Sequence, residues 1–185
     1  MKRFIVAMVA VIFVLTWGVE AHAAAVPKVS LGSLLEQTQQ HKYYSVNGAT
    51  LDFGLQDYIY DTLKSYDMEW YYATFLCQIY QESRYDQNAV AYHANGTVDV
   101  GLCQLKNIYH DEIRAIAGLG PDANFWTDPY ANLAGGMALM RRNWMACWDI
   151  NTAISTYMTG TTSVYSPFYV SDVRKWESTL MEVKK

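Results

Sequence analysis

The sequence predicts a mainly α-helical (α+β) domain that carries one small β-hairpin. Apolar residues recur at spacings of three and four over several segments, which is typical of helices that pack one face on a core. Asn95-Gly96 lies between two short apolar runs, which is typical of a tight turn joining two strands. With 185 residues, of which 51% are hydrophobic, the chain has enough apolar side chains for such a core.

The first 25 residues are expected to be a signal peptide. Lys2 and Arg3 precede the apolar run 4–18, and Ala21-His22-Ala23 offers the small residues that a signal peptidase recognises. The run is short for a membrane span, and a retained anchor is the alternative. We therefore expect an exported protein of the periplasm, cell wall or extracellular space, with no membrane contact beyond this segment.

Residues 26–50 are largely polar and weakly patterned, so we expect a linker or a loosely docked N-terminal arm. The folded domain then spans residues 51–185. Its odd number of cysteines leaves at least one thiol unpaired, and it allows one disulfide whose pairing the sequence does not select. The three cysteines are Cys77, Cys103 and Cys147. Their spacing matches no zinc pattern.

The first two expected helices begin the domain, and each has an apolar stripe on one face. The stripe of the first is Leu55, Ile59, Leu63 and Tyr66, and that of the second, over 69–83, is Tyr72, Phe75, Leu76 and Ile79.

Three further helices are expected in the second half of the domain. The helix over 131–148 follows Asp128-Pro129, a typical helix start. Residues 151–158 are expected to form the fourth helix. The tail 168–183 has helical spacing again, with Pro167 at its entry.

The expected hairpin follows the second helix. Its strands are Ala89–Tyr92 and Val98–Leu102, and its turn is His93–Thr97. Asn and Gly both accept positive φ, so the turn explains Asn95-Gly96-Thr97 better than its formal match to a glycosylation sequon does.

Composition excludes several function classes. The formal net charge is −4 with no block of like charges, which argues against nucleic acid as the main partner. No glycine-rich phosphate loop is present, and the histidines are scattered, so no cofactor and no metal are expected. The 15 tyrosines and 6 tryptophans suit both a core and a sugar-binding groove.

Glu82 is the candidate catalytic residue. It lies three residues past Ile79 and seven past Phe75, so it projects from the apolar stripe of its helix. Burial disfavours the charged form of a carboxyl and raises its pKa. A general acid needs such a raised pKa to hold its proton near neutral pH.

Four motifs occur in order over roughly residues 55–180, and together they resemble those of the soluble lytic transglycosylases. The hairpin segment 95–101 is similar to that of the transglycosylases that accompany secretion and conjugation machines, and to that of animal-type lysozymes. The motifs are Gln81-Glu82-Ser83-Arg84 with Asn88-Ala89-Val90; Gly101-Leu102-Cys103-Gln104-Leu105; Asp128-Pro129 with Asn132 and Gly135; and Tyr157-Met158-Thr159-Gly160.

The resemblance implies a lysozyme-like fold, in which a helical domain carries a small β-hairpin beside a substrate cleft. It implies that Glu82 protonates the glycosidic oxygen of the MurNAc-GlcNAc β-1,4 bond of peptidoglycan and then acts as a base, which gives a 1,6-anhydro-muramic product. We further expect a monomer, with a secretion, conjugation or phage apparatus as a possible partner.

Asp99 is a possible second carboxylate. The corresponding hairpin position of animal-type lysozymes carries one, and two carboxylates about 5 Å apart fit retaining hydrolysis. A hydrolytic muramidase using Glu82 and Asp99 therefore stays an alternative, as does an Asp that only stabilises the turn.

Four residues of the motifs are candidates for substrate binding or support. The hydroxyl of Tyr157 could orient Glu82. Gln104 could bind substrate or hydrogen-bond the hairpin backbone. Ser83 could hold the hairpin, and Asn132 could brace a helix start.

Two residues depart from the family pattern. Cys103 replaces the usual Met, and Met158 replaces an Asn that would offer a polar contact near the cleft. The second change leaves open a wall-binding or scaffold protein with weak catalysis, although a pure binder has no need of Glu82. Chitin is an alternative substrate.

Overall fold

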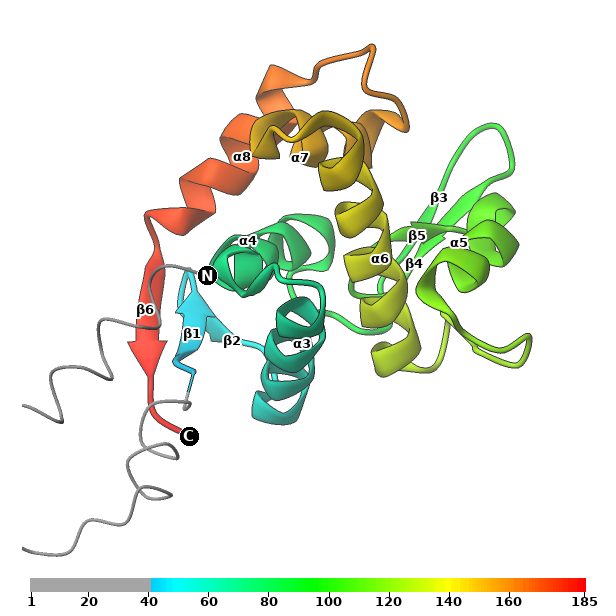
Figure 1. The fold of residues 1–185 in the computed structure, drawn as a ribbon. Helices are drawn as coiled ribbons and strands as arrows, with labels where there is room; N and C mark the ends of the chain where they lie inside the picture. The colour runs from blue at the N-terminus through cyan, green and yellow to red at the C-terminus, as the bar shows by residue number, and fades with distance from the viewer. Residues whose placement is uncertain (1–40) are drawn as a thin grey trace, which may run out of the picture. The chain divides into compact units, whose positions relative to one another are not determined.

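In the computed structural model, residues 41–185 are described, and they form one unit, His41–Lys185. The expected signal peptide and most of the 26–50 segment lie outside the described residues. Helices dominate the unit, so the expected mainly α-helical class is confirmed (Figure 1). The helical elements are α3 (Phe53–Ser65), η2 (Glu69–Tyr71), α4 (Tyr72–Ser83), η3 (Asn107–Tyr109), α5 (His110–Ala117), α6 (Pro129–Cys147), α7 (Ile150–Thr159) and α8 (Pro167–Glu177).

The long helix α6 divides this unit (Figure 1). On one side of it lie α3 and α4, and on the other lie α5 and a small sheet. The core is continuous across α4 and α6, where Leu76, Leu133 and Met137 are fully buried. Burying each such side chain contributes about 1.5–3 kcal/mol. Because α4 and α6 share this core, the end of α4 is held firmly beside the small sheet.

Side-chain caps fix where three helices begin. Asp52, Asp128 and Asp149 each accept hydrogen bonds from backbone N–H groups in the first turn of α3, α6 and α7. Such a cap contributes about 1 kcal/mol. Pro129 follows Asp128 at the first position of α6, so the start expected from Asp128-Pro129 is confirmed.

The expected hairpin is present and gains a third strand. Strands β3 (Val90–Tyr92) and β4 (Val98–Val100) pair antiparallel, and β4 also pairs with β5 (Leu105–Lys106). Gly96 has φ +82°, and Asn95 Oδ1 accepts from the N–H of Thr97 at 3.1 Å. The tight turn predicted at Asn95-Gly96 is therefore confirmed. The second expected strand ends earlier than predicted, because the chain turns at Gly101.

A second antiparallel sheet, with strand order β2-β1-β6, was not expected. Strands β1 (Tyr43–Val46) and β2 (Ala49–Thr50) lie in the 26–50 segment, so folded structure begins before residue 51. Strand β6 (Leu180–Val183) pairs with all of β1. The helix expected over 168–183 therefore ends at Glu177, and its last part is a strand.

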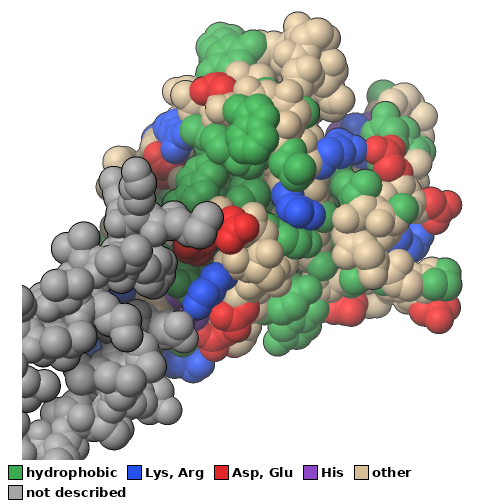
Figure 2. Space-filling view, viewed as in Figure 1, with side chains coloured by type: hydrophobic (Ala, Val, Ile, Leu, Met, Phe, Trp, Pro, Cys, Tyr) green, Lys and Arg blue, Asp and Glu red, His purple; other side chains and the backbone are tan. Residues whose placement is uncertain are grey.

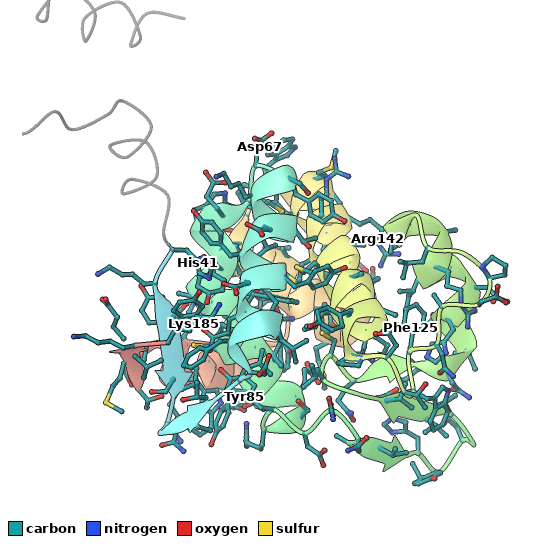
Figure 3. All side chains as sticks on the ribbon, turned by 90° about the horizontal axis from the view of Figure 1, so that it is seen from below. His41, Asp67, Tyr85, Phe125, Arg142 and Lys185 are labelled. Atoms are coloured by element: carbon teal, nitrogen blue, oxygen red, sulfur yellow. The ribbon has the colours of Figure 1, made fainter. Side chains whose placement is uncertain are left out.

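Both ends of the described unit are fastened to α3. His41 Nε2 lies 3.4 Å from Asp57 Oδ1, and Lys185 Nζ lies 2.8 Å from Asp57 Oδ2. Figure 3 shows His41 and Lys185 on the same side of α3. Within the described range, no helix is long and apolar enough to cross a membrane.

Candidate active site

A cleft of about 610 Å³ lies where α4 meets the β3-β4-β5 sheet. Side chains of β4, β5, α5, α6 and α7 line it, together with residues 160–162 after α7. Glu82 and Asp99 both line this cleft, so the structure brings together the two candidate carboxylates. In Figure 2, acidic and basic side chains are interspersed over the visible face outside the grey region.

Glu82 lies in the last turn of α4. The helix ends at Ser83, because Arg84 adopts a left-handed conformation with φ 56°. The pKa of Glu82 is raised from 4.5 to about 7, chiefly because burial removes water from the carboxyl and disfavours its charge. A hydrogen bond from Tyr169 lowers the pKa, and the nearby negative charge of Asp99 raises it.

Tyr169 is the direct hydrogen-bond partner of Glu82, and sequence reasoning missed it. It lies on α8 and is 7% exposed, and its hydroxyl donates to Glu82 Oε1. Burial and the adjacent Glu82 charge raise the pKa of the Tyr169 hydroxyl well above its ordinary value, so it remains a donor at neutral pH. The only sequence signal was its place on the apolar face of a helix, beside Val170 and Val173.

Tyr157 does not make the expected contact with Glu82. Its hydroxyl donates instead to the backbone oxygen of Cys103 at 2.7 Å. Tyr157 thus ties α7 to the turn between β4 and β5. It still lines the cleft, so its ring helps to shape the wall near Glu82.

Asp99 lies on β4, with the side chains of His93 and Lys106 beside its carboxylate. His93 Nε2 lies 2.7 Å from Asp99 Oδ2, and Lys106 Nζ lies 3.9 Å from Asp99 Oδ1. Lys106 is the β5 partner of Asp99 in the sheet register. The carboxylate therefore both braces the hairpin and faces the cleft.

Gln104 and Ser83 make structural hydrogen bonds. Gln104 Nε2 donates to the backbone oxygens of Gly101 and Ala89 at 2.9 and 3.2 Å, which is the backbone contact considered above, while the residue also lines the cleft. Ser83 Oγ donates to Ile79 O within its own helix at 3.2 Å. Ser83 thus has no hydrogen bond to the hairpin that it was expected to hold.

Asn132 holds the turn that follows β4, rather than a helix start. It is 1% exposed on α6. Its Oδ1 accepts from the N–H of Cys103 at 2.8 Å, and its Nδ2 donates to the backbone oxygens of Val100 and Phe125 at 2.9 and 3.0 Å. One buried amide therefore fixes the backbone beneath the cleft.

The two residues that depart from the family pattern differ in exposure. Cys103 is buried under the turn, whereas Met158 is 63% exposed and lines the cleft. All three cysteines are free thiols, so the disulfide considered above is not formed. The Met158 side chain supplies no polar group to the cleft, although neighbouring threonines also line it.

Charged groups from α5 and α6 close one side of the cleft. Arg142 Nη1 lies 2.6 Å from Glu112 Oε1, and Figure 3 shows Arg142 extending from α6 toward α5. Among residues 41–185, no three His, Cys, Asp or Glu side chains gather closely enough to hold a metal ion.

Comparison with known proteins gives one family. A family model described as the transglycosylase SLT domain matches residues 57–175. This range includes Glu82, Asp99, Asn132, Tyr157 and Tyr169. The comparisons with curated proteins and with solved structures give no match.

Proposed function

From the premise that the chain belongs to the transglycosylase SLT domain family, we propose that Glu82 is its catalytic acid and base. This family consists of peptidoglycan lytic transglycosylases, so the chain is an enzyme that acts on peptidoglycan. One observation carries the proposal for Glu82: in a cleft of about 610 Å³, it is a carboxyl whose pKa is raised to about 7.

The proposed reaction has two proton transfers, both by Glu82. The protonated carboxyl first gives its proton to the glycosidic oxygen between MurNAc and GlcNAc. The bond from that oxygen to the anomeric carbon of MurNAc breaks, and GlcNAc leaves as an alcohol. The Glu82 carboxylate then takes the proton of the MurNAc 6-hydroxyl, whose oxygen bonds to the anomeric carbon. The product is a 1,6-anhydro sugar, Glu82 is protonated again, and no water is consumed.

A pKa near 7 suits both halves of this cycle. A carboxyl with its ordinary pKa of 4.5 would be almost wholly ionised at neutral pH and would have no proton to give. The Tyr169 hydroxyl donates to Oε1 and stabilises the carboxylate that forms after the first step. The environment of Glu82 thus supports alternation between its two protonation states.

The test is mass spectrometry of the soluble muropeptides released from purified peptidoglycan. The parent protein is expected to release products that carry 1,6-anhydro-muramic acid. Glu82→Gln is expected to lower the rate by at least about 100-fold, because an amide cannot donate the acid's proton. Glu69→Gln, at an exposed position on η2, is the matched control and should retain the parent rate.

Lysis by Glu82→Gln at the parent rate would remove Glu82 from the mechanism. Loss of activity in both variants would point to damage unrelated to the cleft carboxyl. The absence of soluble products from the parent protein would favour a binding or scaffold role.

A hydrolytic muramidase is the second candidate, because Asp99 lines the same cleft as Glu82. Here Asp99 would act as the second carboxylate, and water would complete the reaction. The same spectra separate the two reactions, since hydrolytic products are one water heavier than anhydro products. Hydrolytic products would give Asp99 a catalytic role, whereas anhydro products would leave it as a brace of the hairpin. The same assay on chitin tests the alternative substrate.

Peptidoglycan lies outside the cytoplasmic membrane, so this enzyme acts in the cell wall or periplasm. We propose that residues 1–25 direct export and that the catalytic domain extends from β1 at Tyr43 through β6. We also propose that the enzyme is a monomer that acts for a secretion, conjugation or phage apparatus.

A further inference from the structure

A buried chain of hydrogen bonds ends at Glu82. The Tyr71 hydroxyl donates to Gln78 Oε1 at 2.7 Å, and Gln78 Nε2 donates to the Tyr169 hydroxyl at 3.4 Å. Tyr169 then donates to Glu82 Oε1. Tyr71 and Gln78 are 0% and 1% exposed, and neither lines the cleft. Two residues that cannot meet substrate are therefore connected to the candidate acid.

The donors and acceptors of this hydrogen-bond chain have one favoured order. In the reverse direction, Tyr169 would donate to the Gln78 amide oxygen, and Gln78 would donate to Tyr71. The Tyr71 proton would then lack an acceptor, since Gln78 is its only hydroxyl partner among the described residues. A buried hydroxyl without an acceptor is costly, so Tyr71 keeps the amide oxygen of Gln78 on its own side. The amide NH₂ then faces Tyr169, which must direct its proton to Glu82.

This direction decides which oxygen of Glu82 holds the acid's proton. Oε1 accepts from Tyr169, so a proton on the neutral carboxyl is favoured on Oε2. We propose that Tyr71 and Gln78 are positioning residues that keep Tyr169 a donor to Oε1 and so reserve Oε2 of Glu82 for the catalytic proton. The inference rests on the proposed role of Glu82.

Tyr71→Phe should disturb this arrangement without touching Glu82 or Tyr169. Once Tyr71 no longer holds the Gln78 oxygen, the amide can turn and accept the proton of Tyr169. The Glu82 carboxylate then loses a donor, and its pKa rises. The proton of the neutral acid becomes shared between Oε1 and Oε2, so fewer molecules are ready to react. A slower enzyme that remains active to higher pH is therefore expected.

Tyr169 on α8 belongs to the hydrogen-bond chain, and three groups outside the chain act on Glu82 or are influenced by its charge. They are Asp99 on β4, Cys103 in the turn after β4 and Tyr157 on α7, and Tyr71→Phe removes none of them. A change in the pH dependence can therefore be assigned to the hydrogen-bond chain.

The matched control is Tyr72→Phe. Tyr72 is also buried, and its hydroxyl also donates to a glutamine, Gln56 Oε1, at 2.8 Å. That glutamine bonds to the backbone of Tyr44 and Leu51, and within residues 41–185 no hydrogen bond leads from it to Glu82. Both variants remove one buried hydroxyl from neighbouring positions, so a general loosening of the fold affects them alike.

The experiment measures muropeptide release by the parent, Tyr71→Phe and Tyr72→Phe proteins as a function of pH. For Tyr71→Phe we expect a kcat at low pH that is roughly two- to tenfold lower, an apparent KM within about twofold, and an alkaline limb raised by about 0.5 pH unit or more. Tyr72→Phe should keep the parent profile. Identical profiles for all three proteins, or equal shifts in both variants, would overturn the proposal.

An NMR titration keeps the two proposals separable. The carboxyl carbon of Glu82 is assigned by its absence in Glu82→Gln, and its pKa is read in each protein without substrate. A raised pKa in Tyr71→Phe alone supports the positioning role even if Glu82 is not the catalytic acid. An unchanged pKa refutes it while leaving the activity of Glu82 untouched.

Discussion

At the scale of single residues, the burial of Glu82 supports its proposed function but lowers the stability of the folded protein at the pH values where its carboxyl ionises. Burial raises its pKa from 4.5 to about 7, so the folded protein holds a proton that the unfolded chain releases. A folded pKa above the unfolded one contributes stability that is present below pH 4.5 and is lost as the pH rises through 7. Within that window, ionisation of Glu82 works against folding.

Glu82→Gln should therefore make the protein more stable at pH 8 and hardly change it at pH 4. The pKa shift corresponds to a gain of up to about 3 kcal/mol at the higher pH, because an amide is neutral at both. Urea unfolding at the two pH values measures this. An equal effect at both would show that the variant alters packing rather than charge.

The sequence located Glu82 but not its partner. The spacing of Glu82 from Phe75 and Ile79 placed it on the apolar face near the end of its helix, and that argument is local. Tyr169 lies 87 positions away and contacts Glu82 only because α4 packs against α8. The motif pattern favoured Tyr157 as that partner, but the Tyr157 hydroxyl donates to the backbone oxygen of Cys103 instead.

At the scale of elements, the turn between β4 and β5 depends on a close approach to α6. Gly101 has φ +74°, and a Cβ atom there would lie 2.3 Å from Asn132 Nδ2. Because Asn132 is buried and already bonded to three backbone groups, it has no room to withdraw.

Gly101→Ala should cost roughly 2–4 kcal/mol of unfolding free energy, because it adds a steric clash to an unfavourable positive φ. Gly96→Ala is the control: its φ is +82°, yet nothing lies within 4 Å of the added atom, so about 1 kcal/mol is expected. Thermal unfolding compares them. Equal losses would mean that backbone conformation alone determines the cost.

Elements were predictable where their signals were local. The helical stripes and the Asn95-Gly96 turn each contain their own evidence, and both elements formed as expected. The β1-β2 hairpin also carried a local signal, Asn47-Gly48, which the polar character of 26–50 obscured. For β6, the spacing of Leu180 and Val183 mimicked a helix, and only pairing with β1 makes the segment extended.

At the scale of the whole molecule, the terminal sheet closes the described unit. Removing residues 180–185 should lower the melting temperature by roughly 10 °C or more, because β1 loses its full-length partner and Asp57 loses Lys185. Lys42→Ala is the control, since it removes only the exposed Lys42–Glu182 pair, which solvent screens, and it should melt close to the parent. A truncated protein that melts with the parent would show that β6 is dispensable.

The pairing of β1 with β6 also sets the order of folding. Lys42 and Glu182, which join these strands, are 140 positions apart, so β1 leaves the ribosome long before its partner exists. Contacts this distant in sequence form late and slowly. An incomplete chain therefore cannot close its terminal sheet, and β1 stays without its full-length partner until synthesis has passed Val183.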